Sequence, residues 1–437
     1  MAVACSYRLD LARTHTVAGI EGLAPWWTYV LKNVDSLDEG RGLVSGSLYA
    51  PGQSIASWIV LAVLDGRDDP AVLRIVFGFL DGVCVVFLVL AGKELLSWGA
   101  GLVAGLLYAL WPAGASASVN LLHDHSPQPF FLFAGLWLVL CALRLERPAL
   151  LFAGACLLGL PALFRADGSV VGAALALGVA AVVWNARRAP GRALAWGALA
   201  FAGVLAPSLP WDAWTFSRTG RLQHIAMGDA GAAVFMRFGH ASGFAGARYN
   251  DSEVAFLGGS SEPFGPDWTD ARRQRIPGDF GRTLFWADPV RYARLVRSEM
   301  RSVATERAGR AAWWAPDSRN SEASRATEPS GRLEAWLARL GRSRLLSSPV
   351  DTPWIYLLGV LGTVSGLIAR RPTVVVPAVV GLFWMAALTV LLPNARYLLM
   401  PSCFLFPLMG VLFASVARVF VQGVGSLRRA GAEGKTR

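Results

Sequence analysis

The chain has 437 residues, of which 54% are hydrophobic and only 16% are charged. A soluble protein of this length carries roughly 25% charged residues, so the composition excludes a cytosolic enzyme, a disordered protein and a secreted disulfide scaffold. The net charge is +11, and only three of the 41 basic residues are lysines. The surplus arginine lies between apolar stretches, which favours membrane topology and lipid head groups over nucleic acid as the partner.

Nine stretches are long and apolar enough to cross a bilayer, which takes roughly 20 helical residues. Because only helices satisfy their own backbone groups in lipid, we predict an all-α polytopic membrane protein. The predicted crossings are 72–92, 95–113, 126–143, 149–164, 168–184, 194–211, 353–369, 372–392 and 397–422.

The short loops between these crossings predict their orientation. Alternate loops carry most of the short-loop basic residues, for example Arg187-Arg188 and Arg370-Arg371, and should be cytoplasmic. The predicted parts are an outer segment with a first acidic loop and a short interfacial helix (1–71), a transmembrane bundle (72–211) with a short outer loop (114–125), an extracytoplasmic domain with amphipathic helices (212–352), C-terminal transmembrane helices (353–422) and a basic cytoplasmic tail (423–437).

This topology places the N-terminal segment outside, although no convincing crossing precedes it. Residues 17–31 contain Glu21 and suit an interfacial helix better than a crossing. Either the tail is translocated unaided or the given start omits a first helix, and we favour the omitted helix. In the outer domain, Asp288-Pro289 predicts the start of an N-capped amphipathic helix.

Ionisable side chains gather at the predicted outer ends, where charges are costly unless they have a use or a partner. A carboxylate can act as a general base, and arginines can hold phosphate oxygens, so the combination suits transfer from a lipid phosphate. Each residue alone is more typical of a helix-end charge in solvent than of a catalytic site. The residues are Asp35, Asp38, Glu39, His123, Asp124, His125, Arg165, Asp167, Arg218, Arg221 and Arg396.

The order of the motifs is more informative than any one of them. The acidic segment Asn33-Val-Asp-Ser-Leu-Asp-Glu precedes Pro51 and a short apolar helix, and in this the chain resembles the GT-C membrane glycosyltransferases. That superfamily includes the protein O-mannosyltransferases and the aminoarabinose transferases of lipid A. The resemblance continues through Leu110-Trp-Pro112 with Asn120-Leu-Leu-His-Asp124, Leu163-Phe-Arg165-Ala-Asp-Gly168, Pro210-Trp211 with Arg218, and Arg396-Tyr397-Leu-Leu-Met-Pro401; Ala166 replaces the usual proline.

The resemblance implies a bundle of about nine transmembrane helices that moves a sugar from a polyprenyl-phosphate donor to an acceptor, usually with inversion. It places the site on the extracytoplasmic side of the plasma membrane, and we expect a bacterial inner membrane. Asp38 would be the base, with Glu39 supporting it or exchanging roles and Asp35 competing for the assignment. Asp124 would orient the acceptor or the base. Arg165, Arg218 and Arg396 would contact phosphate, and Tyr49, His123 and Tyr397 would line the substrate site.

No cofactor is expected, and a divalent ion at His123-Asp124-His125 is the less favoured alternative. Two other functions stay open: a lipid-linked polysaccharide ligase or polymerase, and a transporter or flippase. A transporter would carry charges at mid-membrane depth, where Asp81 is the strong candidate. Which sugar is moved, and whether the acceptor is a protein, a lipid or an envelope glycan, also stays open.

Overall fold

In the computed structural model, every regular element of the described residues is a helix. The structure describes residues 1–14, 30, 33–40, 51–64, 70–120, 126–165, 168, 170–219, 283, 285–305, 353–391 and 399–433. Most of the predicted outer domain (212–352) and of the predicted interfacial helix (17–31) lies outside these residues. Both therefore remain predictions.

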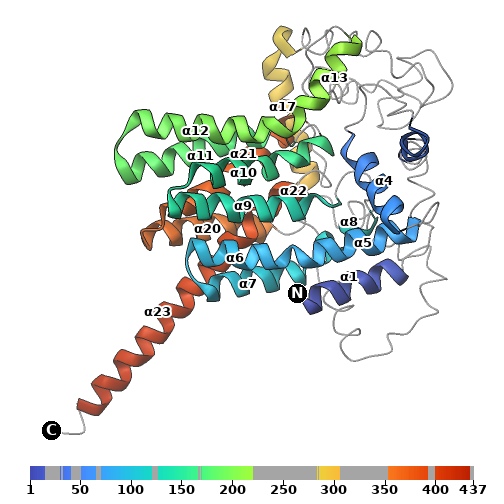
Figure 1. Ribbon diagram of the computed structural model, residues 1–437. Helices are drawn as coiled ribbons and strands as arrows, with labels where there is room; N and C mark the ends of the chain where they lie inside the picture. Colours follow the sequence, from blue (N-terminus) through green and yellow to red (C-terminus); the bar gives the residue numbers. More distant parts are fainter. Residues whose placement is uncertain are drawn as a thin grey trace.

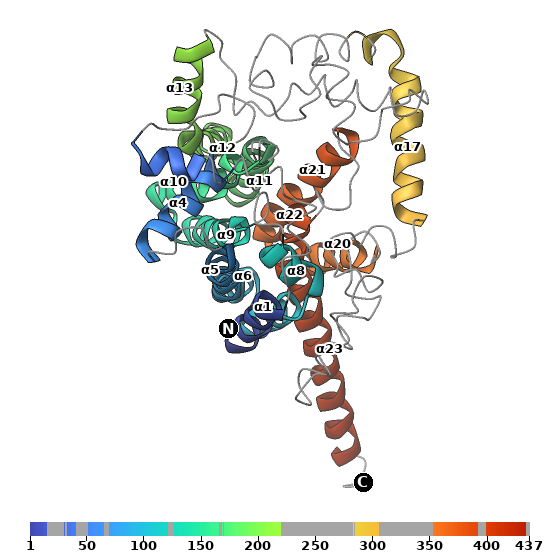
Figure 2. The same cartoon turned by 90° about the vertical axis from the view of Figure 1, so that its right-hand side faces the viewer.

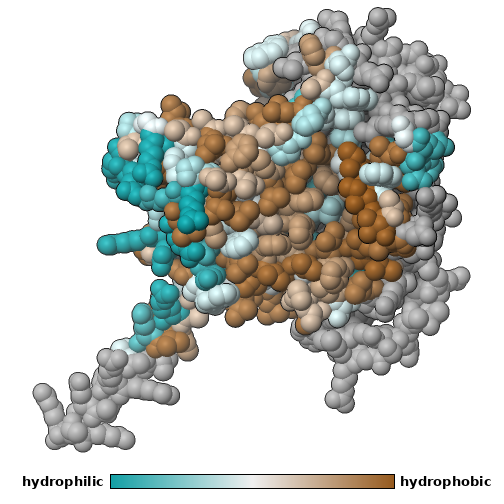
Figure 3. Space-filling view, viewed as in Figure 1, coloured by the Kyte–Doolittle hydropathy of each residue, from teal (hydrophilic) through white to brown (hydrophobic). Residues whose placement is uncertain are grey.

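Five helices are long and apolar enough to cross a membrane (Figure 1). Figure 3 shows that apolar side chains cover the surface over them, as expected where a surface faces lipid tails. Two of the five are single helices, α9 (Gln128–Leu145) and α11 (Val170–Arg187). Val72–Leu95 joins α5 (Pro70–Val83) to α6 (Val85–Leu95), and Met400–Gln422 lies mostly in α23 (Leu405–Glu433). Pro190–Trp214 joins α12 (Pro190–Leu205), η3 (Ala206–Ser208) and the start of α13 (Leu209–Thr219).

Shorter apolar helices complete the bundle. They are α7 (Trp98–Ala109), α10 (Pro148–Gly159), which runs on into η1 (Leu160–Leu163), α20 (Pro353–Ile368) and α21 (Val375–Leu391). Each of the nine predicted crossing ranges thus contains a helix. Five helices meet the requirements of length and apolarity, which supports a helical membrane protein, whereas nine crossings remain a prediction.

Helical hairpins in the bundle turn at charged residues with left-handed backbone. Glu146, Arg188 and Arg370 have φ between 52° and 56°, and each is followed two residues later by a proline that opens the next helix. Ion pairs join the turns, because Glu146 pairs with both Arg187 and Arg192. These predicted cytoplasmic loops therefore lie at one end of the bundle, visible as a hydrophilic edge in Figure 3.

Glycines allow the helices to approach closely, as is common within membranes. A Cβ atom on Gly135 of α9 would lie 2.7 Å from the carbonyl oxygen of Gly154 in α10. A Cβ atom on Gly154 would lie 2.8 Å from the backbone nitrogen of Val139. The backbones of α9 and α10 are thus in direct contact, so side chains at these two positions would separate the helices.

Four further helices surround the bundle: α1 (Ala2–Thr14), α4 (Gly52–Leu64), α8 (Pro112–Asn120) and α17 (Pro289–Thr305). Helix α1 packs along α5 and α8. Helix α17 runs crosswise to the spanning helices in both views (Figures 1 and 2). Its N-cap is Asp288, whose Oδ1 accepts a hydrogen bond from the backbone N–H of Arg291 (2.8 Å), so the helix predicted after Asp288-Pro289 is present.

Candidate active site

The acidic segment, residues 33–40, folds as a short helix (33–38) followed by a turn. One face is buried and carries Asn33, Val34 and Ser36, whereas Asp35, Asp38 and Glu39 are exposed. Val34 packs in an apolar cluster with Leu61 of α4 and Leu73 and Phe77 of α5. This packing fixes the segment on the bundle and directs its carboxylates outward, where they are accessible to a substrate.

Polar contacts attach the acidic segment to the N-terminal half of α4. Asn33 Nδ2 donates a hydrogen bond to Ser54 Oγ (3.4 Å), and both residues are buried. Within α4 itself, Gln53 Nε2 donates to Ser57 Oγ (3.3 Å). The acidic segment and the start of α4 are therefore in direct contact.

On its other side, the start of α4 meets η1, which leads to Arg165. A Cβ atom on Gly52 would lie 2.7 Å from the carbonyl oxygen of Leu163 and 3.0 Å from the ring of Phe164, so only glycine fits there. The backbone N–H of Arg165 donates to the Pro161 oxygen (3.0 Å), and the residue is 6% exposed. The structure thus brings a predicted phosphate ligand next to the unit that carries the predicted base.

A second carboxylate lies on α13, which packs against η3, and η3 in turn packs against η1. Asp212 in the first turn of α13 is 6% exposed and accepts a hydrogen bond from Ser208 Oγ (3.0 Å). Next to it, Trp211 stacks on Trp214 with ring centroids 4.7 Å apart. The sequence analysis did not single out Asp212. A signal was present, since an acidic residue directly after Pro210-Trp211 stands at the end of a crossing.

The structure describes both the backbone and the side-chain exposure of three of the nine predicted site residues: Asp38, Glu39 and Arg165. Arg218 lies in the last turn of α13, and its side chain is outside the description. The other predicted residues, Tyr49, His123, Asp124, Arg396 and Tyr397, lie outside the described residues. Among the residues that are described, no group of three or more His, Cys, Asp or Glu side chains could hold a metal ion.

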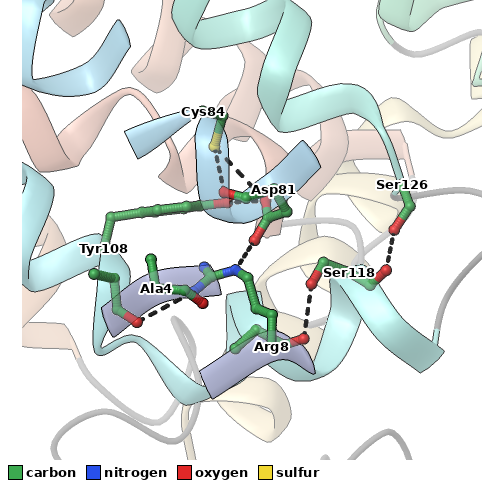
Figure 4. A network of polar contacts seen from close by, with 9 residues as sticks. Ala4, Arg8, Asp81, Cys84, Tyr108, Ser118 and Ser126 are labelled. Atoms are coloured by element: carbon green, nitrogen blue, oxygen red, sulfur yellow. Dashed lines mark hydrogen bonds and ion pairs between the residues drawn. The ribbon is translucent and has the colours of Figure 1, made fainter. Parts of the chain in front are cut away.

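A buried ion pair lies apart from this group (Figure 4). Asp81 of α5 accepts hydrogen bonds from Arg8 Nε of α1 and from the hydroxyl of Tyr108 (2.7 Å). Arg8 also donates to the Ala109 oxygen (3.2 Å), just before α8. The sequence identified Asp81 as a mid-span charge but did not predict that Arg8 neutralises it.

The environment of Arg8 indicates a structural role for this pair. Burial lowers the pKa of the guanidinium, but the neighbouring Asp81 carboxylate more than offsets this, so the pKa lies above its usual value. Arg8 therefore stays charged at any physiological pH. A Cβ atom on Gly82 would lie 2.6 Å from Cys5 Sγ, so α1 is packed closely against α5 around the pair.

Comparison with known proteins finds a similar fold among solved structures. No protein-family model matches the chain, and no curated protein matches it. Among solved structures, the apo oligosaccharyltransferase of Archaeoglobus fulgidus matches with a TM-score of 0.52 and 14% identity, over 98% of this chain and 51% of that one. The chain shares its fold with this oligosaccharyltransferase.

Two more structures of the archaeal enzyme match at 13% identity and a TM-score of 0.48. One is the Archaeoglobus fulgidus oligosaccharyltransferase in complex with Zn and sulfate, over 94% of this chain and 47% of that one. The other is AglB from Archaeoglobus fulgidus with an inhibitory peptide and a dolichol-phosphate, over 93% and 48%. The chain spans about half the length of these structures, and at such identity the likeness concerns the fold.

Proposed function

We propose that the protein is a glycosyltransferase that moves a sugar from a polyprenyl-phosphate donor to an acceptor at the outer face of the membrane. The GT-C fold supports the class of enzyme. The observation that carries the proposal is the contiguity of three elements: the exposed carboxylates of the acidic segment, the N-terminal half of α4, and Arg165. This arrangement supplies a base and a phosphate ligand on neighbouring elements.

The proposed reaction uses these groups in a defined order. Asp38, with Glu39 in support, accepts the proton of an acceptor hydroxyl or amine as that atom attacks the anomeric carbon. The bond from that carbon to the phosphate oxygen breaks, and Arg165 stabilises the departing lipid phosphate. Attack opposite the leaving group inverts the anomeric configuration. Asp35 remains the alternative base, because it lies on the same exposed side of the segment.

The remaining predicted residues complete the proposal in supporting roles. Asp124 would orient the acceptor or the base, and Arg218 and Arg396 would contact the phosphate beside Arg165. Tyr49, His123 and Tyr397 would line the substrate site. The transfer does not require a metal, although a divalent ion at His123 and Asp124 would be compatible with the same chemistry. The proposed membrane is the plasma membrane.

A transfer assay with the reconstituted protein tests the proposal. Proteoliposomes would receive a panel of radiolabelled polyprenyl-phosphate sugars and a membrane extract as the source of acceptor. We expect wild type to move label from at least one donor, and Asp38→Asn or Glu39→Gln to slow transfer by about 100-fold or more, because a positioned base contributes about that much.

The matched control is Asp288→Asn, the same change at the N-cap of α17, where asparagine caps a helix as well as aspartate does. This variant should transfer at the wild-type rate. The proposal is wrong if folded wild type releases no label from any donor. If Asp38→Asn and Glu39→Gln both keep full activity, the role of base passes to Asp35, which Asp35→Asn then tests.

A further inference from the structure

Neutral polar side chains are buried where the acidic segment meets α4. Five of them, on the two facing elements, are each at most 3% exposed. Two side-chain hydrogen bonds, Asn33 to Ser54 and Gln53 to Ser57, connect four of these residues in pairs. We refer to the five as the neutral polar cluster: Asn33, Ser36, Gln53, Ser54 and Ser57.

Two atoms of the neutral polar cluster have no hydrogen-bond partner in the described part of the chain. They are Gln53 Oε1 and Ser36 Oγ, and both are buried. On the same helix, the buried indole Nε1 of Trp58 also has no partner among the described residues. Proteins leave few buried polar groups unpaired, because each loses its hydrogen bonds to water without compensation. Their concentration beside two exposed carboxylates therefore points to recognition of a ligand.

The elements that carry the neutral polar cluster also adjoin both the carboxylates and the arginine of the proposed site. On one side, Asp38 follows Ser36 by two residues on the exposed face of the same short helix. On the other side, Gly52 directly precedes Gln53 and meets the backbone of Leu163, two residues before Arg165. A glycosyl phosphate has the same order, since its sugar ring stands between the attacking acceptor and the phosphate.

We propose that the neutral polar cluster is the subsite that recognises the sugar ring of the donor, an inference that rests on the proposed function. A sugar hydroxyl both donates and accepts hydrogen bonds. Gln53 Oε1 would accept one from a ring hydroxyl, and Ser36 Oγ could donate or accept. Because the cluster is uncharged, it binds a neutral ring without competing with Arg165 for the phosphate.

The contacts within the neutral polar cluster allow a ring to enter. The acidic segment and α4 are separate elements, joined here by the hydrogen bond from Asn33 to Ser54 at 3.4 Å. Val34 of the segment also packs against Leu61 of α4, so entry of a ring between the two elements would exchange this hydrogen bond and displace that apolar contact.

Donors that each lack one ring hydroxyl test the subsite. We expect wild type to lose at least about tenfold in kcat/KM with one or more of these deoxy donors, because the polar group facing the missing hydroxyl stays unpaired. In Gln53→Leu, kcat/KM for the same deoxy donor should lie within about threefold of that for the parent donor, since the amide group that binds the hydroxyl is absent. The matched control is Gln422→Leu on the exposed surface of α23, which should keep the wild-type ratio.

Ser57→Ala provides a second, smaller change. It removes the hydroxyl that holds the Gln53 amide, and it should also reduce the ratio of parent to deoxy donor. If both variants are folded and transfer sugar with the wild-type ratio for every deoxy donor, the subsite is wrong while the proposed function stands. If wild type transfers no sugar at all, the proposed function fails, and the subsite fails with it.

Discussion

Two regions in the first quarter of the chain carry charged side chains in opposite environments, one buried and one exposed. At α1 and α5, Arg8 and Asp81 neutralise each other inside the protein, and the Tyr108 hydroxyl adds a hydrogen bond to the carboxylate. On the acidic segment, Asp38 and Glu39 are exposed beside a buried cluster of neutral polar groups.

The comparison separates charges that hold the fold from charges that can do chemistry. The buried pair binds its charges to each other within the protein, and it ties α1 to the first spanning helix. Carboxylates on exposed residues are in contact with solvent, where a proton can be exchanged. A charge near a membrane is thus a candidate for function only after its partners within the chain have been identified.

The largest expected effect follows from breaking the buried pair. Asp81→Ala leaves Arg8 charged and without its partner in the interior, which should destabilise the protein by about 3–5 kcal/mol. Unfolding in mixed micelles with increasing SDS would measure the loss. The control is the double variant Arg8→Met with Asp81→Leu, which removes both charges and should recover most of the stability. Equal loss in the single and the double variant would contradict a compensated pair.

The next effect concerns Arg165. Arg165→Gln removes the cation proposed to stabilise the leaving phosphate, so transfer should slow by about 100-fold. Arg165→Lys should recover part of the rate, because it keeps the charge but loses the bidentate geometry. Arg371→Gln, an exposed arginine at a hairpin turn, is the matched control and should leave the rate unchanged. A rate in Arg165→Gln that equals wild type would remove Arg165 from the site.

The smallest effect belongs to the exposed ion pairs at the opposite end of the bundle. Arg192 pairs with Glu146 at 2.8 Å, and both side chains are 40% or more exposed. Arg192→Ala should change the free energy of unfolding by less than about 1 kcal/mol, and the change should shrink as salt is added. A loss of unfolding free energy as large as that of Asp81→Ala would show that exposed and buried ion pairs do not differ in their contribution to stability.

The sequence predicted the helices well because the membrane restricts the backbone to few choices. Apolar runs must be helical in lipid, and the charged turns before Pro148, Pro190 and Pro372 end them where the structure does. Each of these features depends on residues that are close in the sequence.

The sequence did not predict contacts between distant residues. Arg8 lies 73 residues before Asp81, and no periodicity connects them. Asp212 was missed for the same reason, since its burial depends on how α13 leaves the bundle. The buried face of the acidic segment was also missed, because Asn33 and Ser36 look like ordinary loop residues in the sequence, although both are buried and Asn33 contacts α4.

The most direct test compares Asp38→Asn and Asp81→Asn in one preparation, with transfer rate and thermal midpoint measured on the same samples. We predict that Asp38→Asn loses about 100-fold or more in transfer and keeps the wild-type midpoint. Asp81→Asn should instead lower the midpoint, and transfer per folded molecule should stay close to wild type. Wild-type transfer by Asp38→Asn, or a midpoint that falls as far in Asp38→Asn as in Asp81→Asn, would contradict the assignment of the base to Asp38.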